Sequence, residues 1–252
     1  MTNLYIIYFL ILGTVMGSFY NVVGLRVPKK ESIVHPGSHC ASCQHELKWF
    51  ELIPVVSYII LKGKCRKCGQ GVSLIYPVIE MLTGLLFAFS FYLLGFSLEF
   101  LVALVFISLL IIIVVSDIAY MLIPDSILIL FGSILLLLRI IEPLSPWWDS
   151  FAGAAAGFCL LLLIAVVSKG GMGGGDIKLY AVVGLVLGVK LTLLSFFIAA
   201  LLGSIVGMTA ISMKIRKRKE PIPFGPFIAA ASVITYFFGA ELINGYVNWL
   251  LY

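Results

Sequence analysis

The chain has 252 residues, of which 62% are hydrophobic and only 12% are charged, and its mean hydropathy is +1.13. This composition excludes an ordinary soluble domain and predicts an all-α polytopic membrane protein. The formal net charge of +5 does not indicate nucleic-acid binding, because eight Lys and Arg lie between residues 26 and 67 and five between residues 214 and 219. Such basic clusters instead indicate which loops of a membrane protein face the cytoplasm.

The first apolar segment runs from about Leu4 to Val23, close to the roughly twenty residues that a helix needs to cross a bilayer. No basic residue precedes it, so it does not resemble a secretory signal. Arg26, Lys29 and Lys30 follow it and predict a cytoplasmic C-terminal end, with the N-terminus outside. Residues 1–23 are therefore expected to form the first transmembrane helix.

Residues 24–71 form the one long polar stretch and contain two Cys-x2-Cys pairs, Cys40 with Cys43 and Cys65 with Cys68. Each pair can place two thiolates on one tight turn, and two such knuckles predict a closed, structural zinc site with four cysteine ligands. The alternative is two disulfides, which a loop held in the reducing cytoplasm disfavours. We expect the metal to supply folding energy that this loop cannot obtain from a hydrophobic core.

All three histidines flank the first cysteine pair and could be alternative ligands, ligand-orienting donors or simply solvated side chains. They are His35, His39 and His45. The segment Leu47–Leu61 is apolar but interrupted by Pro54, so we expect it to pack on the knuckles or to lie at the membrane surface.

Seven further spans are expected in residues 72–252, which makes about eight transmembrane helices in all. They are Val72–Gly95, Leu98–Ser116, Leu122–Ile141, Phe151–Ser168, Lys178–Val189, Leu191–Met213 and Ile222–Gly239. The run Lys178–Val189 is short for a bilayer. Counting from an outside N-terminus places the cysteine loop and residues 117–121, 169–177 and 214–221 on the cytoplasmic side.

Two acids at membrane boundaries form the main candidate site. Asp117 ends one apolar run, and Asp176 follows the glycine-rich stretch of residues 170–175. An acid at such a place is costly unless it is paired, hydrated or protonated, and is a functional-site hypothesis by default. Two adjacent carboxylates share one proton, as in aspartic proteases, and Gly173 and Gly175 would let a substrate backbone come close.

Each of these features has a simpler interpretation. The glycines could form a flexible turn with Asp176 capping a helix, and Asp117 could reach for interfacial water. Asp125, directly after Pro124, is expected in the first turn of a helix. Glu80 is a third buried-acid candidate, or a partner for a nearby cation. A proton-coupled transporter could use the same two aspartates, but it has no evident use for a cysteine-bearing loop.

Several motifs, in order along residues 13 to about 180, resemble the prepilin peptidases, intramembrane aspartyl proteases with a Gly-x-Gly-Asp motif. They are residues 17–23 with Arg26 and Pro28, the cysteine pairs, Glu51–Tyr58, Tyr76–Glu80, Asp117-x6-Pro124-Asp125 and Gly173–Asp176, with Pro223–Phe227 resembling the family's last-helix signature. The resemblance implies that Asp117 and Asp176 are catalytic and that Asp125 is not. It also implies cleavage of a short basic leader, just after a glycine, from type IV prepilins and pilin-like secretion or competence proteins.

The resemblance further implies an inner-membrane enzyme acting at the cytoplasmic face, and in many members S-adenosylmethionine-dependent N-methylation of the new N-terminus. Because the polar stretch carries no glycine-rich nucleotide motif, a cofactor site would be built from the cysteine loop and the helix ends. Glu51, Lys62 and Glu80 are the charged candidates for this site. Ile75 and Ala41 stand where the family has Arg and Pro, which puts any role of that arginine in doubt but leaves the aspartates untouched. The oligomeric state is not predicted.

Overall fold

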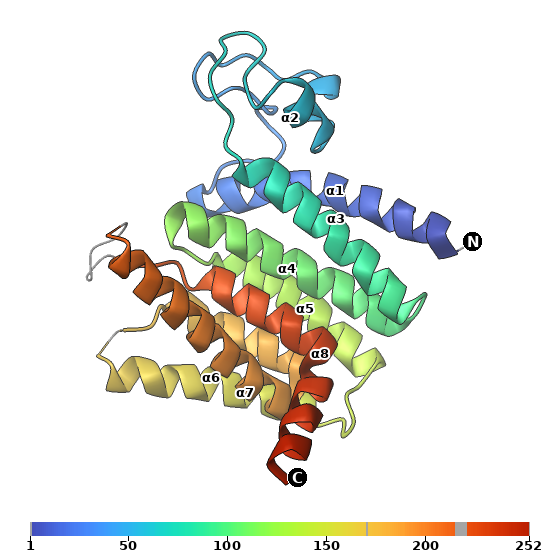
Figure 1. Ribbon diagram of the computed structural model, residues 1–252, viewed down its shortest axis with the longest axis vertical. Helices are drawn as coiled ribbons and strands as arrows, with labels where there is room; N and C mark the ends of the chain where they lie inside the picture. The colour runs from blue at the N-terminus through green and yellow to red at the C-terminus, as the bar shows by residue number, and fades with distance from the viewer. Residues whose placement is uncertain (1, 170, 215–220, 252) are drawn as a thin grey trace. The chain divides into compact units, whose positions relative to one another are not determined.

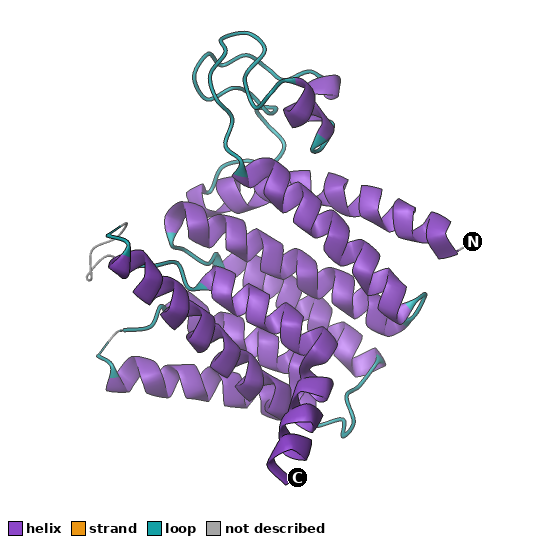
Figure 2. Ribbon diagram, viewed as in Figure 1, coloured by secondary structure: helices purple, strands orange, loops and turns teal. Residues whose placement is uncertain are grey.

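The computed structural model describes residues 2–169, 171–214 and 221–251. Those residues form helices and loops, and none of them forms a β-strand (Figure 2). The predicted all-helical fold is confirmed. The elements, labelled in Figure 1, are α1 (Thr2–Arg26), η1 (Val27–Lys29), η2 (Trp49–Leu52), α2 (Val56–Ile60), α3 (Ile75–Leu94), α4 (Leu98–Tyr120), α5 (Asp125–Ile141), α6 (Asp149–Val167), α7 (Gly174–Ser212) and α8 (Gly225–Leu251). The predictions for residue 170 and for the basic cluster of residues 215–220 lie outside the described residues.

Six helices of the described chain are long and apolar enough to cross a membrane: α1, α3, α4, α6, α7 and α8. Helix α5 has 17 residues, which is at the short end of the range for a transmembrane helix. The chain is thus a multi-pass membrane protein.

Helix α7 contains both of the segments expected at residues 178–189 and 191–213. It is assigned as one helix of 39 residues, but Gly188 has non-helical dihedral angles, φ 74° and ψ 176°. The rings of Tyr180 and Phe196 lie 6.0 Å apart, whereas 16 residues of continuous helix would separate them by about 24 Å. The chain therefore folds back at Gly188, and the two halves of α7 with the six other long helices correspond to the eight expected spans.

Two polar side chains stabilise the reversal of chain direction at Gly188. Arg139, buried near the end of α5, donates to the Val186 carbonyl at 2.9 Å, and the Asp149 carboxylate accepts from the Val189 amide at 3.2 Å. These bonds satisfy a carbonyl and an amide that the broken helix leaves without helical partners. A Cβ on Gly188 would collide with the Asp149 carboxylate, so both the positive φ and the lack of space require glycine there.

The chain divides into two compact units, residues 1–115 and 116–252. In the first unit, α1 packs closely on α3 through small residues. A Cβ on Gly13 would lie 2.7 Å from the Cα of Gly84, and one on Gly17 would lie 2.9 Å from the Cα of Glu80. Such contacts bring membrane helices together by van der Waals packing, because lipid provides no hydrophobic driving force between them.

In the second unit, α6 packs against the first half of α7 in the same way. Cβ atoms on Gly153 or Gly157 would collide with the backbone of Gly184 or Tyr180. Glycine at these positions lets the two helices approach closely. The backbone contact fixes the first half of α7, which carries Asp176 at its start.

The segment between α1 and α3 is mostly loop, with η1, η2 and the short α2 (Figure 1). Trp49, Ile59 and Ile60 are largely exposed, whereas Phe50 lies beneath the guanidinium group of Arg66, 5.3 Å from its ring centroid. Since Arg66 lies between Cys65 and Cys68, this contact agrees with the expected packing of residues 47–61 on a cysteine knuckle.

Candidate active site and metal centre

The second unit brings Asp117 and Asp176 into one cavity. Asp117 lies in the last turn of α4 and Asp176 in the first turn of α7, and their exposed fractions are 6% and 9%. The cavity has a volume of about 180 Å³. Its other lining residues are Met121, Leu122, Ile123, Asp125, Gly173, Gly174 and Gly175. The two acids predicted to pair therefore share one cavity.

Glycine backbone lies directly against both carboxylates. The amide of Gly225, at the start of α8, donates to Asp117 Oδ2 at 2.7 Å, and a Cβ on Gly225 would lie 2.8 Å from that oxygen. A Cβ on Gly173 would lie 2.9 Å from Asp176 Oδ2, and one on Gly175 would lie 2.7 Å from the Cβ of Ile123. Gly225 appeared in the sequence only as part of a resemblance motif, and its contact with Asp117 was not anticipated.

The backbone dihedral angles show whether the glycines before Asp176 are needed to form a turn or to leave space. Gly173 has φ −69°, and no glycine among the described residues 171–175 has a positive φ. A turn that only glycine can adopt therefore does not explain them. Gly173 and Gly175 provide space instead: a Cβ on Gly175 would collide with Ile123, and one on Gly173 would crowd the Asp176 carboxylate.

Asp117 and Asp176 are two carboxylates in one small cavity, where like charges repel each other. Such a pair titrates as a unit and holds one proton between its members over a broad pH range. It can remove a proton from water and donate one to a carbonyl oxygen in the same step.

Asp125 has a different environment. It is the first residue of α5, as its position after Pro124 predicted, and its carboxylate pairs with the ammonium group of Lys178 at 2.7 and 2.8 Å. Both side chains are exposed. Asp125 thus lines the edge of the cavity as half of an ion pair.

The first unit brings together all four predicted cysteines, whose sulfur atoms lie within 4.8 Å of one another and could hold a metal ion. The Cys40 and Cys68 sulfurs are 3.8 Å apart, and those of Cys43 and Cys65 are 3.9 Å apart. Four sulfurs about 2.3 Å from a tetrahedral zinc ion would be separated by about 3.8 Å. The donor set and its spacing therefore fit zinc.

The two cysteine pairs have the same backbone geometry. The carbonyl of Cys40 accepts from the Gln44 amide at 3.0 Å, and the carbonyl of Cys65 accepts from the Gly69 amide at 2.9 Å. Gln44 and Gly69 both have positive φ, 56° and 72°. Amide groups of Cys43 and Ser42 lower the pKa of Cys40 to about 6, which favours the thiolate. Although the Gln70 amide acts in the opposite direction, burial and the neighbouring sulfurs raise the pKa of Cys68 to about 11.

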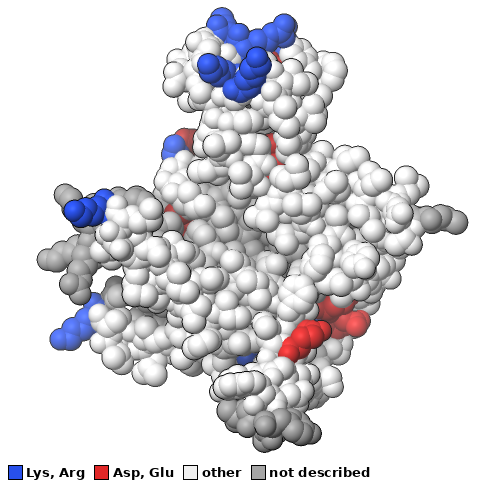
Figure 3. All heavy atoms as spheres, in the orientation of Figure 1, with Lys and Arg blue, Asp and Glu red and all other residues white. Residues whose placement is uncertain are grey.

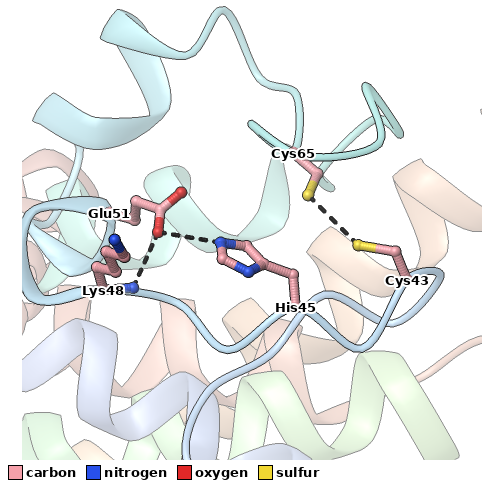
Figure 4. A network of polar contacts seen from close by, with 5 residues as sticks. All are labelled: Cys43, His45, Lys48, Glu51 and Cys65. Atoms are coloured by element: carbon pink, nitrogen blue, oxygen red, sulfur yellow. Dashed lines mark hydrogen bonds and ion pairs between the residues drawn. The ribbon is translucent and has the colours of Figure 1, made fainter.

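None of the three histidines belongs to the sulfur cluster. His39 Nδ1 is 2.9 Å from the Gly37 carbonyl oxygen. His45 Nε2 is 3.5 Å from Glu51 Oε2, which also accepts from the Lys48 amide at 2.9 Å (Figure 4). That amide and the nearby His45 hold the pKa of Glu51 below its usual range. Glu51 is thus fixed next to the first knuckle.

A second cavity, of about 530 Å³, lies between the cysteine loop and the ends of α1 and α3. Glu51 and Glu80 both line it, whereas Lys62 is not among its lining residues. Glu80 Oε2 accepts from the Val55 amide at 2.7 Å, and Val55 has φ 62°, an uncommon conformation for a β-branched residue. The carboxylate of Glu80 thereby ties α3 to the loop.

Two residues that line this cavity each have one side-chain oxygen that is buried without a hydrogen-bond partner. These oxygens are Oδ1 of Asn21 and Oε1 of Glu51. Buried acceptors of this kind are rare and indicate a missing donor, such as water or a ligand. Asn21 was named in the sequence only within the resemblance motif of residues 17–23, and its place in this cavity was not anticipated.

Comparisons with known proteins agree with this geometry. Residues 11–94 match the model of the bacterial peptidase A24 N-terminal domain, and residues 104–208 match that of the type IV leader peptidase family. The chain is 46% identical to the prepilin leader peptidase/N-methyltransferase of Bacillus subtilis (strain 168) over 96% of this chain and 97% of that relative. It is 33% identical to the protein of the same name from Xanthomonas campestris pv. campestris, over 94% and 93% of the two chains.

No solved structure matches the chain. The two family models and the extent of the similarity to curated relatives lead to one conclusion. The chain belongs to the type IV leader peptidase family, peptidase family A24.

Proposed function

We propose that this protein is an intramembrane aspartyl endopeptidase that removes the leader from type IV prepilins and pilin-like secretion or competence proteins. The observation that carries the proposal is the pair of buried aspartates, Asp117 and Asp176, in one cavity. One carboxylate takes a proton from the attacking water, and the other protonates the carbonyl oxygen of the scissile peptide bond. Family membership leaves the transporter alternative without support.

The experiment uses purified full-length protein in lipid vesicles with a prepilin-like substrate and intact-mass readout. Asp117→Asn and Asp176→Asn should each leave the substrate uncut. Glu99→Gln, an acid-to-amide change in the first turn of α4, serves as the matched control and should cut normally. Cleavage by either aspartate variant at the normal rate would refute the catalytic assignment.

We propose that the same protein N-methylates the new N-terminus and that the large cavity of the first unit is the site of this reaction. The methyl donor would be S-adenosylmethionine, which supplies a methyl group on a sulfonium when bound. It is a cation with an ammonium group, and the unpartnered oxygens of Asn21 and Glu51 offer acceptors for such a ligand. Glu51 and Asn21 would hold and orient it, while Glu80 positions the loop.

This second activity is tested by separating it from cleavage. Glu51→Gln and Asn21→Leu should weaken binding of S-adenosylmethionine, measured by calorimetry, and should slow methylation of a pre-cleaved pilin peptide by about tenfold or more. Leader cleavage should change little. Glu46→Gln, in the same loop but exposed, is the matched control. Normal binding and methylation in both cavity variants would place the methyl-transfer site elsewhere.

We further propose that the cysteine loop and the aspartate cavity act at the cytoplasmic face, with zinc bound by Cys40, Cys43, Cys65 and Cys68. Lys and Arg side chains gather on the loop between α1 and α3 (Figure 3), as the positive-inside rule expects of a cytoplasmic segment. Labelling of a single engineered cysteine at Ser32 from either side of sealed vesicles would test this orientation. Labelling only from the outer face of right-side-out vesicles would reverse it.

A further inference from the structure

The ion pair between Asp125 and Lys178 lies at the edge of the aspartate cavity and has no part in the proposed reaction. The ammonium group contacts both carboxylate oxygens, at 2.8 and 2.7 Å. Asp125 lines the cavity, and Lys178 follows Asp176 by two residues on α7. The pair thus joins the start of α5 to the start of α7, next to both aspartates.

The segment between Asp117 and Asp125 is folded as a compact turn. The Met121 amide donates to the Asp117 carbonyl at 2.9 Å, and the Ser116 hydroxyl donates to the Leu122 carbonyl. Met121 takes a positive φ of 52° to close the turn. Asp117 and Asp125 are therefore held in one local structure.

Asp176 and Lys178 belong to a second local structure, the first turns of α7. The Asp176 amide donates to the Gly173 carbonyl at 3.1 Å, and backbone packing against α6 fixes this half of the helix. Each local structure therefore carries one aspartate of the dyad and one member of the ion pair.

We propose that Asp125 and Lys178 are positioning residues that set the separation of the Asp117 and Asp176 carboxylates. Arg139 ties the far end of α5 to Val186 of α7. At the end of these helices that carries the aspartates, the contact between Gly175 and Ile123 limits how close the two local structures come without limiting how far they part. The ion pair supplies that second limit. A loss of alignment between catalytic groups lowers the rate of the chemical step without removing substrate contacts.

This inference rests on the proposed peptidase function, so its test needs one arm with substrate and one without. The variants are Asp125→Asn, Lys178→Gln and the charge swap Asp125→Lys with Lys178→Asp, all in the full-length protein in lipid vesicles. Lys190→Gln, the same change in the second half of α7, is the matched control. Thermal unfolding confirms that each variant is folded.

With a prepilin-like peptide, each single variant should lower kcat about three- to tenfold and leave KM within about twofold, because an exposed ion pair contributes modestly. The charge swap should recover activity to within about threefold of the original, although a lysine at the start of α5 is less favourable than an aspartate. A swap no better than the single variants would overturn the positioning role and assign the charge of Asp125 or Lys178 to a direct contact with substrate.

The arm without substrate measures amide hydrogen exchange over residues 118–124 and 171–178. Either single variant should speed exchange in both segments, and the swap should slow it again. Unchanged exchange in the single variants would refute the inference even if the protein cleaves prepilins. If the original protein cleaves no prepilin but shows the expected exchange pattern, the proposed function fails while the ion pair's structural role stands.

Discussion

The two sites of this protein are held in place by different means. Between residues 27 and 74, the only buried side chains are Cys65 and Glu51, so the loop depends on sulfur ligands and hydrogen bonds for its shape. Asp117 instead lies near the end of the buried helix α4, and Asp176 lies at the start of α7, which packs backbone against backbone on the glycines of α6. The cysteine loop should lose its function when the metal is removed, and the aspartate site should lose its function when helix packing is disturbed. The two should therefore be separable.

The largest expected effect comes from the aspartates themselves. Asp117→Asn and Asp176→Asn each remove the shared proton and should lower leader cleavage by about a thousandfold or more. Methylation of a pre-cleaved pilin peptide should persist in both variants, because that reaction is assigned to the other unit. Intact-mass measurements of leader removal and of methyl addition, made on the same variants, check this. Loss of both activities in a folded variant would show that the two sites are not separable.

Loss of the metal should reduce methylation more than cleavage, which is the reverse of the effect of the aspartate variants. Cys43→Ser, or treatment with a strong chelator, removes folding energy from the loop and should abolish most methylation while reducing cleavage less than about tenfold. Zinc content is measured on the same samples. Cys159→Ser, a change at the one cysteine outside the cluster, should alter neither activity. Equal loss of cleavage and methylation in Cys43→Ser would mean that the loop also supports the aspartate site.

A packing change should affect only the aspartate site. The added Cβ of Gly225→Ala would lie 2.8 Å from Asp117 Oδ2 and should displace the carboxylate, lowering kcat for cleavage about ten- to a hundredfold with normal methylation. Gly245→Ala lies on the same helix and meets nothing within 4 Å, so it controls for changes in helix propensity. Normal cleavage by Gly225→Ala would show that this glycine contact does not set the position of Asp117.

The smallest expected effect concerns the strained residue of the loop. Val55 has φ 62°, which glycine adopts without steric cost, so Val55→Gly should change loop stability by at most about 1 kcal/mol. Methylation should remain within about threefold, since the backbone amide that donates to Glu80 is retained. Limited proteolysis of the loop provides the measurement. Much faster proteolysis would mean that the valine side chain itself holds the loop.

Local spacing explains which parts of this architecture the sequence predicts. The two cysteine pairs predict their own knuckles, because each knuckle is formed by a few consecutive residues. Asp117 and Asp176 are conspicuous because acids are rare in apolar segments. The start of α7 was expected at Lys178 rather than Gly174, since glycine has low helix propensity; close packing of Gly175 on Ile123 favours the helix there.

Contacts between distant segments were the part that sequence reasoning could not supply. Gly225 donates to Asp117 across 108 residues, and Lys178 pairs with Asp125 across 53. The residue type and its local sequence do not predict which distant residue a glycine or a helix-terminal acid will contact. Similarly, the unpartnered oxygen of Asn21 becomes visible only when the cavity around it is known.

The fold-back at Gly188 has a consequence for where the substrate is cut. The first half of α7, from Gly174 to Gly188, is roughly 14 residues long and extends about 21 Å, whereas the hydrocarbon layer is about 30 Å thick. The residues on either side of Gly188 bond to Arg139 and Asp149. If Gly188 lies at one membrane surface, Asp176, twelve residues earlier in the helix, would lie about 18 Å from that surface and about 12 Å below the other. We infer that the short first half of α7 places hydrolysis within the lipid layer, so a membrane-embedded substrate need not be extracted before it is cleaved.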